Sequence, residues 1–261
     1  AAELHERLKQ HRDAEVYYRQ LLEKFPNDAK VDVALYQLAW LLRQNEDAAK
    51  ADVERRKAEA ETLFERLRHQ FKQSTYWSDA VFRLAEAARD RKDAKQVAEL
   101  VGELAAAADA KSANGEQLVD AQTLAHAFYL QGRFAADSGD WAGAEQAMTS
   151  LMKRCPNSDL LLAAEFWIAE AAYRQANYDE ASRRFDALVA TAQGKQAAWL
   201  GMIPLRRAQV LAQQKKWPEA IALAETIAKD FPNFAQQYEA DYLIGRAFAA
   251  DGKFDEARGY Y

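Results

Sequence analysis

The chain has 261 residues, of which 29% are charged, and its formal net charge is −5. The negative net charge argues against the electrostatic footprint of nucleic-acid binding, so we expect no nucleic-acid partner. Its longest apolar stretch, residues 160–172, is broken by Glu165 and Glu170. The stretch is too short to span a bilayer, so no membrane insertion is expected.

Helical patterns follow one another along the chain. Pro and Gly are scarce, with 5 and 10 copies, and almost no stretch alternates with period two, so an all-α fold is predicted. A ten-residue pattern recurs at 135–144, 172–181, 211–220 and 248–257. Each copy contains a helix end, a short polar turn, an aromatic residue and a small residue that opens the next helix. Recurrence of this kind predicts a solenoid of helix pairs.

The spacing of small and large residues in these repeats resembles the tetratricopeptide repeat. A small residue lies in the middle of the first helix (helix A), another lies early in the second helix (helix B), and a large residue follows four positions later. The early small residue of helix B is found at Ala14, Ala60, Val97, Ala144, Ala181, Ala220 and Ala257. Helices A and B cross closely at the small residues, where a larger side chain would force them apart.

The resemblance implies an all-α, right-handed α–α superhelix of about six to seven helix–turn–helix repeats. The predicted repeats span residues 1–31, 32–77, 78–124, 125–161, 162–200, 201–237 and 238–261.

Some repeats exceed the family length of about 34 residues. Extra residues within 45–56 are helix formers without Gly or Pro, which predicts an extended helix. Near 109–116, the run Lys-Ser-Ala-Asn-Gly predicts a loop. Pro204 falls inside helix A of the sixth repeat, where we expect a kink. The alternative is that this helix starts near Ile203 and that Trp199 lies in a preceding short helix.

Three repeats close with Pro-Asn, after Phe25, Cys155 and Phe231. Proline halts helix B, and the polar residues that follow cap the next helix. This style is similar to bacterial cell-envelope tetratricopeptide proteins, namely the outer-membrane assembly lipoprotein and the Tol-Pal-associated coordinator. The likeness implies a location in the periplasm or cell envelope, with the cytoplasm as the alternative.

Both ends of the chain fall inside a repeat, and neither carries a polar capping repeat. We therefore expect a fragment of a longer protein, which could self-associate through its cut repeats.

The sequence carries no recognisable catalytic or metal-binding motif. Cys155 is the only cysteine, so we expect no intrachain disulfide and a side chain that packs as a small hydrophobe. The four histidines lack ligand spacing, and neither a Gly-rich phosphate loop nor a nucleophile elbow is present. We expect no enzymatic activity, no metal and no cofactor.

In the family, helix A lines the concave face of the superhelix, where peptides or partner helices dock. Aromatic and arginine residues, which are enriched in interface hot spots, occupy many of the corresponding positions here. The predicted protein-binding face consists of Tyr36, Trp40, Arg43, Phe82, Arg89, Tyr129, Arg133, Phe166, Tyr173, Tyr242 and Arg246. The alternative is that the aromatic residues only pack between adjacent A helices. The family's Lys, Asn and Arg clamp for C-terminal carboxylates is not found.

Three functions are compatible with the sequence. The first is an interaction scaffold whose concave face binds a peptide or protein segment, in a bacterial envelope complex. The second is a structural spacer or oligomerisation arm of a larger protein. The third is an accessory that presents substrates to an enzymatic domain outside the fragment.

Overall fold

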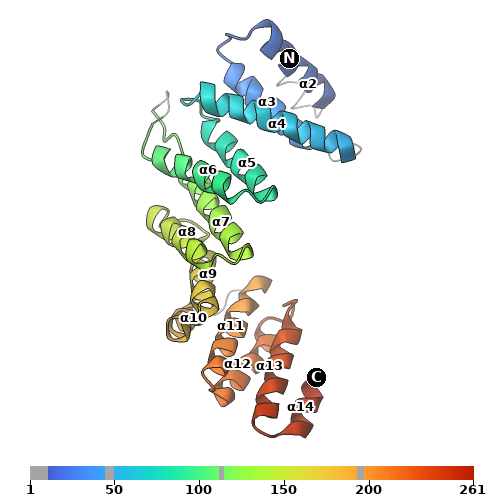
Figure 1. The fold of residues 1–261 in the computed structure, drawn as a ribbon, viewed down its shortest axis with the longest axis vertical. Coiled ribbons are helices and arrows are strands. Elements are labelled where there is room, and N and C mark those ends of the chain that lie inside the picture. Colours follow the sequence, from blue (N-terminus) through green and yellow to red (C-terminus); the bar gives the residue numbers. More distant parts are fainter. Residues whose placement is uncertain (1–10, 45–49, 112–114, 193–196) are drawn as a thin grey trace. The chain divides into compact units, whose positions relative to one another are not determined.

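The structure of the chain, a computed structural model, describes residues 11–44, 50–111, 115–192 and 197–261. The described residues form α-helices joined by short turns, with one short 3-10 helix and one isolated β-bridge (Figure 1). They divide into two compact units, Ala1–Gln131 and Gly132–Tyr261. The predicted all-α repeat fold is confirmed.

In the first unit, helices α2 to α6 each pack against the next helix in sequence. They are α2 (His11–Lys24), α3 (Val31–Gln44), α4 (Lys50–Gln70), α5 (Trp77–Asp90) and α6 (Ala94–Ala107). Helix α4 has 21 residues and covers part of the predicted extension at 45–56, of which 45–49 lie outside the described residues. The predicted loop at 109–116 contains a turn and a bridge from Lys111 to Gln117, and residues 112–114 likewise lie outside the description.

Helix α7 (Ala121–Asp137) crosses the boundary between the units. The helices of the second unit are α8 (Trp141–Arg154), α9 (Leu161–Arg174), α10 (Tyr178–Ala192), α11 (Met202–Gln213), α12 (Trp217–Asp230), α13 (Gln237–Ala250) and α14 (Phe254–Tyr260), with the 3-10 helix η1 (Ala198–Gly201) before α11. Helix α11 contacts both α9 and α13. These three A helices therefore form one layer of the second unit.

The predicted small residues are buried at every helix crossing that the structure describes. Those of helix B are at most 3% exposed: Ala14, Ala60, Val97, Ala144, Ala181, Ala220 and Ala257. Their counterparts in helix A are also buried: Ala39, Ala85, Gly132, Ala169, Ala208 and Gly245. A methyl group added at Gly132 would lie 2.7 Å from the terminal carbon of Met148. A larger side chain at Gly132 would therefore require Met148 to move.

Turns from helix A to helix B share one backbone geometry. Lys92, Ala176 and Lys215 have positive φ angles of 60°, 60° and 61°, and Gly139 and Gly252 have φ angles of 80° and 75° at the same place. The residue after each donates its N–H to a carbonyl five residues earlier, as Asn177 does to Ala172 at 2.9 Å. This hydrogen bond is typical of a left-handed helix cap, where glycine is the preferred residue.

Turns from helix B to helix A also repeat. Phe25, Cys155 and Phe231 each donate their N–H to the carbonyl four residues earlier and accept from the N–H three residues later. Phe71 makes the same two bonds although no proline follows it. The turn therefore depends on the backbone bonds, and proline only reinforces it.

The kink predicted at Pro204 is wrong. Helix α11 begins at Met202, directly after η1, so Pro204 lies in the first turn of the helix. The N–H groups of a first turn have no partner within the helix, so proline removes no hydrogen bond there. Trp199 lies in η1, as the alternative interpretation proposed.

Candidate functional site

Tyr36, Trp40 and Arg43 meet residues of α5 in the first unit. Tyr36 stacks on Trp40, with ring centroids 6.4 Å apart, and its hydroxyl donates to Asp79. Burial, together with this hydrogen bond, raises the pKa of the Tyr36 phenol. Arg43 pairs with Glu86 at 3.4 Å. Tyr36 and Arg43 thus already have partners on α5.

The indole of Trp40 lies beneath a charged side chain of α5. The guanidinium carbon of Arg83 lies 4.9 Å from the ring centroid. Arg83 also pairs with Asp79 at 3.2 Å and with Glu86 at 3.0 Å. The three predicted residues therefore belong to one aromatic and ionic cluster that joins α3 to α5.

Other predicted residues of the first unit lie apart from this cluster. Phe82 makes an edge contact with His126, with centroids 6.5 Å apart. Arg89 is exposed and pairs with Asp90 at 2.8 Å. Tyr129 is half-buried.

Two predicted residues of the second unit also have packing roles. The guanidinium carbon of Arg133 lies 4.3 Å from the centroid of the Trp167 ring. Phe166 is only 6% exposed and makes edge contacts with Phe185 and Trp199. A side chain buried to this degree offers little surface to a partner.

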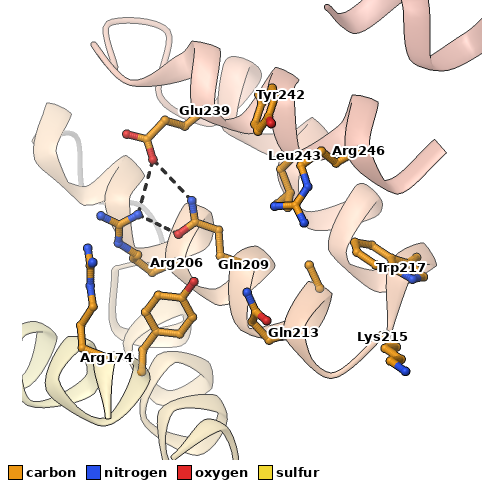
Figure 2. Close-up of a pocket in the computed structure, with 12 residues that line it drawn as sticks. Arg174, Arg206, Gln209, Gln213, Lys215, Trp217, Glu239, Tyr242, Leu243 and Arg246 are labelled. Carbon is orange, nitrogen blue, oxygen red and sulfur yellow. Dashed lines mark hydrogen bonds and ion pairs between the residues drawn. The ribbon is translucent and has the colours of Figure 1, made fainter. Parts of the chain in front are cut away.

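Tyr173, Tyr242 and Arg246, the remaining predicted residues, line one pocket of about 530 Å³ in the second unit (Figure 2). The other lining residues are Arg174, Arg206, Gln209, Ala212, Gln213, Lys215, Trp217, Glu239 and Leu243. They come from α9, α11 and α13 and from the start of the turn and helix that follow α11. The pocket therefore lies on the layer of A helices.

A buried carboxylate organises one end of the pocket. Glu170 of α9 is 2% exposed. It lies between Arg174, whose Nε is 2.7 Å away, and Arg206, whose Nε is 3.0 Å away. Arg206 also donates to Gln209 at 2.7 Å and reaches Glu239 of α13 at 3.4 Å. These contacts connect three successive A helices. Burial strengthens the Coulomb attraction within such a pair, but it also adds the free-energy cost of removing the charges from water.

The opposite end of the pocket is open and aromatic. Figure 2 shows Arg246, Leu243, Trp217 and Lys215 on the side away from Arg206. Tyr242 is 56% exposed. Within the described part of the chain, neither Arg246 nor Lys215 forms an ion pair.

Several pocket residues were missed by the sequence analysis. Arg174, Arg206 and Glu239 are absent from the predicted binding face. Lys215, which lies in a turn, and Trp217, the first residue of α12, are also absent from it. The adjacent Arg206 and Arg207 were a signal, since an arginine within a packed helix is rarely buried unless it has a charged partner.

The described ranges also include one cysteine, Cys155. Cys155 is 3% exposed, and burial raises the pKa of its thiol, which makes it less reactive. No three His, Cys, Asp or Glu side chains converge at metal-ligand spacing in these ranges. No helix within them combines the length and apolar character that a membrane crossing needs.

Two family models match the chain. One, described as a tetratricopeptide repeat-like domain, matches residues 116–261, and one described as a tetratricopeptide repeat matches residues 1–28. No curated protein matches the chain.

Several solved structures are similar. A tetratricopeptide repeat protein from Parabacteroides merdae has 14% identity and a TM-score of 0.54, with coverage of 99% of this chain and 87% of that one. A putative kinesin light chain from Podosopora anserina has 14% identity and a TM-score of 0.54, with coverage of 72% and 92%. MamA has 16% identity and a TM-score of 0.51, with coverage of 68% and 90%. At these identities the likeness shows the fold alone.

Proposed function

Because the chain belongs to the tetratricopeptide-repeat family, whose repeats generally mediate protein–protein interactions, we propose that it is an interaction scaffold that binds a segment of a protein partner. The proposed binding surface is the pocket between α9, α11 and α13, which we call the A-helix pocket. The observation that carries this proposal is the combination of an open cavity with tyrosine, tryptophan and arginine in its lining. These three residue types dominate the energetics of protein interfaces.

The pocket favours a scaffold over a spacer or an oligomerisation arm. A spacer needs stable packing between repeats, and the buried small residues already provide it. Arg246 forms no ion pair within the described ranges, and Tyr242 is 56% exposed although its ring also contacts that of Tyr261, with centroids 5.7 Å apart. They are available to a partner.

The cluster of Tyr36, Trp40 and Arg43 is a second proposed contact surface for the same partner. Its side chains are half-buried, and their partners on α5 hold them in fixed orientations, which lowers the entropy lost on binding. Replacing all three with Ala tests this contribution separately from the A-helix pocket.

Site-specific cross-linking tests the proposed function. A photoreactive amino acid at Gln213, which is exposed and lines the pocket, should form adducts with a partner in cells of the source organism. The control carries the same amino acid at Glu225, an exposed position on α12 outside the pocket lining. Adducts at Gln213 that are absent at Glu225 are expected. No adduct at Gln213, or the same adducts at both positions, would contradict the proposal.

We also propose a bacterial envelope complex as the setting of this scaffold. The support is the Pro-Asn closure after Phe25, Cys155 and Phe231, which is similar to the style of envelope tetratricopeptide proteins. Fractionation of source cells tests the setting, because an envelope protein should leave with the periplasmic or membrane fraction. Recovery with the cytosol would contradict it.

A further inference from the structure

The lining of the A-helix pocket carries more positive than negative charge. Four cationic side chains line it, namely Arg174, Arg206, Lys215 and Arg246, against the single carboxylate of Glu239. With Glu170, which lies behind the two arginines, the count is four cations against two anions. The whole chain has the opposite sign, with a net charge of −5. The positive charge is therefore local to the pocket.

The cations at the Arg206 end are already compensated. Glu170 pairs with Arg174 and Arg206, and Glu239 pairs with Arg206 at 3.4 Å. An incoming anion at this end would have to compete with both carboxylates. This end of the pocket is consequently a fixed wall that orients the lining.

The cations at the other end are uncompensated within the described residues. Arg246 and Lys215 are exposed, and neither forms an ion pair there. Trp217 lies between them in Figure 2. Gln213, one turn along α11 from Gln209, is exposed and has a free amide in the described part of the chain. A carboxylate beside the two cations and a peptide group beside the amide would satisfy all three side chains.

From this arrangement we infer that the A-helix pocket selects an acidic segment of the partner protein, whose Asp or Glu side chains bind Arg246 and Lys215. The inference rests on the proposed function and specifies the chemistry of the partner. The occupant is an extended segment, because the cations and the Gln213 amide are spread over α11, α13 and the turn between α11 and α12. Its backbone lies over Tyr242 and Trp217, whose rings supply flat apolar surface.

Glu239 opposes this occupant from within the pocket. Its side chain is 30% exposed and approaches Arg206 only at 3.4 Å, a long contact for an ion pair. An acidic segment that extends past Arg246 toward Arg206 meets this carboxylate. Glu239 therefore limits how many consecutive acidic residues the pocket accepts, and its neutralisation strengthens binding.

Binding of short labelled peptides tests the inference on the whole chain. The acidic probe is a fluorescein-labelled (Glu-Ser)4 peptide with an amidated C-terminus, and the neutral probe is the matching (Gln-Ser)4 peptide. A third probe, (Gln-Ser)4 with a free C-terminal carboxylate, reports carboxyl-terminus recognition. Fluorescence anisotropy at low salt should show binding of the acidic probe, with a Kd at least about tenfold below that of either (Gln-Ser)4 probe, since one charge-assisted contact is worth about this factor.

Matched variants locate the binding. Arg246→Gln with Lys215→Gln should raise the Kd of the acidic probe at least about tenfold, because both charge-assisted contacts are lost. Arg183→Gln with Lys229→Gln removes the same two charges from exposed positions on α10 and α12 and should leave the Kd unchanged. Glu239→Gln should lower the Kd about threefold, as expected for removing one partly exposed like charge. Circular dichroism confirms that each variant stays helical.

The outcomes separate this inference from the proposed function. If the two double variants raise the Kd of the acidic probe equally, binding depends only on the net charge of the chain, and the inference is overturned. Failure of the acidic probe to bind, or equal binding of the probe with a free C-terminus, would also overturn it. If adducts at Gln213 persist in the Arg246→Gln and Lys215→Gln variant, the proposed scaffold function is retained and only the inference of an acidic partner segment is overturned. If no adduct forms at Gln213 in the parent chain, the proposed function itself fails.

Discussion

At the scale of single residues, each described turn from helix A to helix B that has the left-handed cap contains one residue with a positive φ angle. Gly139 and Gly252 adopt it without strain, whereas Lys92, Ala176 and Lys215 adopt it with a side chain. A Cβ atom at positive φ crowds the neighbouring carbonyl. The hydrogen bonds of the cap hold these residues in place against that strain.

Ala176→Gly should therefore stabilise the protein by about 0.5–1 kcal/mol, because the strain is removed and the cap bonds are kept. Gly139→Ala is the reverse change, at a site where an added Cβ meets nothing within 4 Å, and it should destabilise by a similar amount. Urea denaturation of the two variants measures both effects. Destabilisation by Ala176→Gly would show that the turn is not strained.

Asp120 precedes α7 and caps it. Its carboxylate accepts from the Thr123 N–H at 2.8 Å and from the Thr123 hydroxyl at 2.6 Å. Burial acts to raise the pKa of Asp120, but these hydrogen bonds more than offset it, so the pKa lies below the usual 3.8. A carboxyl with a depressed folded pKa stabilises the protein above its unfolded pKa, and this contribution is lost as the pH falls through the folded pKa.

Asp120→Ala should destabilise the protein by about 1 kcal/mol at pH 7, a typical value for a lost helix cap. The difference in unfolding free energy between the variant and the parent should shrink as the pH falls below about 3.8. The parent carboxyl then becomes protonated and no longer stabilises the folded state. Denaturant titrations at pH 7 and pH 3 measure it. A difference that stays constant with pH would contradict the assigned role of the carboxylate.

At the scale of helices, the packing depends on small residues where A and B cross. Ala169, Ala181 and Phe185 share one buried cluster in the second unit, together with Leu200 and Ile203. The cluster thus combines one repeat with the start of the next. Such packing makes each crossing sensitive to added volume.

Ala181→Trp should destabilise the protein by at least about 1–3 kcal/mol, because the fully buried position cannot accept an indole without moving a helix. Ala187→Trp, at an exposed position of the same helix, should change the stability little. Thermal or urea unfolding followed by circular dichroism compares the two. If Ala181→Trp unfolds no more easily than the control, the repeat register is wrong.

The crossings could be predicted from the sequence because each depends on residues within one repeat, at fixed spacing. Ala14, Ala181 and Ala257 are buried for the same local reason. The pocket could not be predicted in this way. The contact between Glu170 and Arg206 joins two repeats, so it depends on how α11 lies against α9.

Pro204 and Phe71 show two further limits of the sequence analysis. A proline permits either a kink or a position in the first helical turn, and the residues before Pro204 are compatible with both. The turn after Phe71 follows from backbone bonds and carries no Pro-Asn signal. In both cases the deciding interactions are made by the backbone, which side-chain patterns report only indirectly.

At the scale of the whole molecule, the chain consists of two compact units of paired helices, and each carries a surface cluster on its A helices. In the first unit, the side chains of the cluster are largely engaged with one another. In the second unit, the A-helix pocket combines a fixed ionic wall with an open cationic end. The open end makes the second unit the principal site of partner binding in our account.

Photo-cross-linking from Gln213 in source cells, followed by identification of the adducts by mass spectrometry, tests the proposed scaffold function directly. We expect one dominant protein adduct, absent from the Glu225 control, that maps to an acidic segment of the partner. The absence of pocket-specific adducts would contradict the assignment of the chain as an interaction scaffold that uses this pocket.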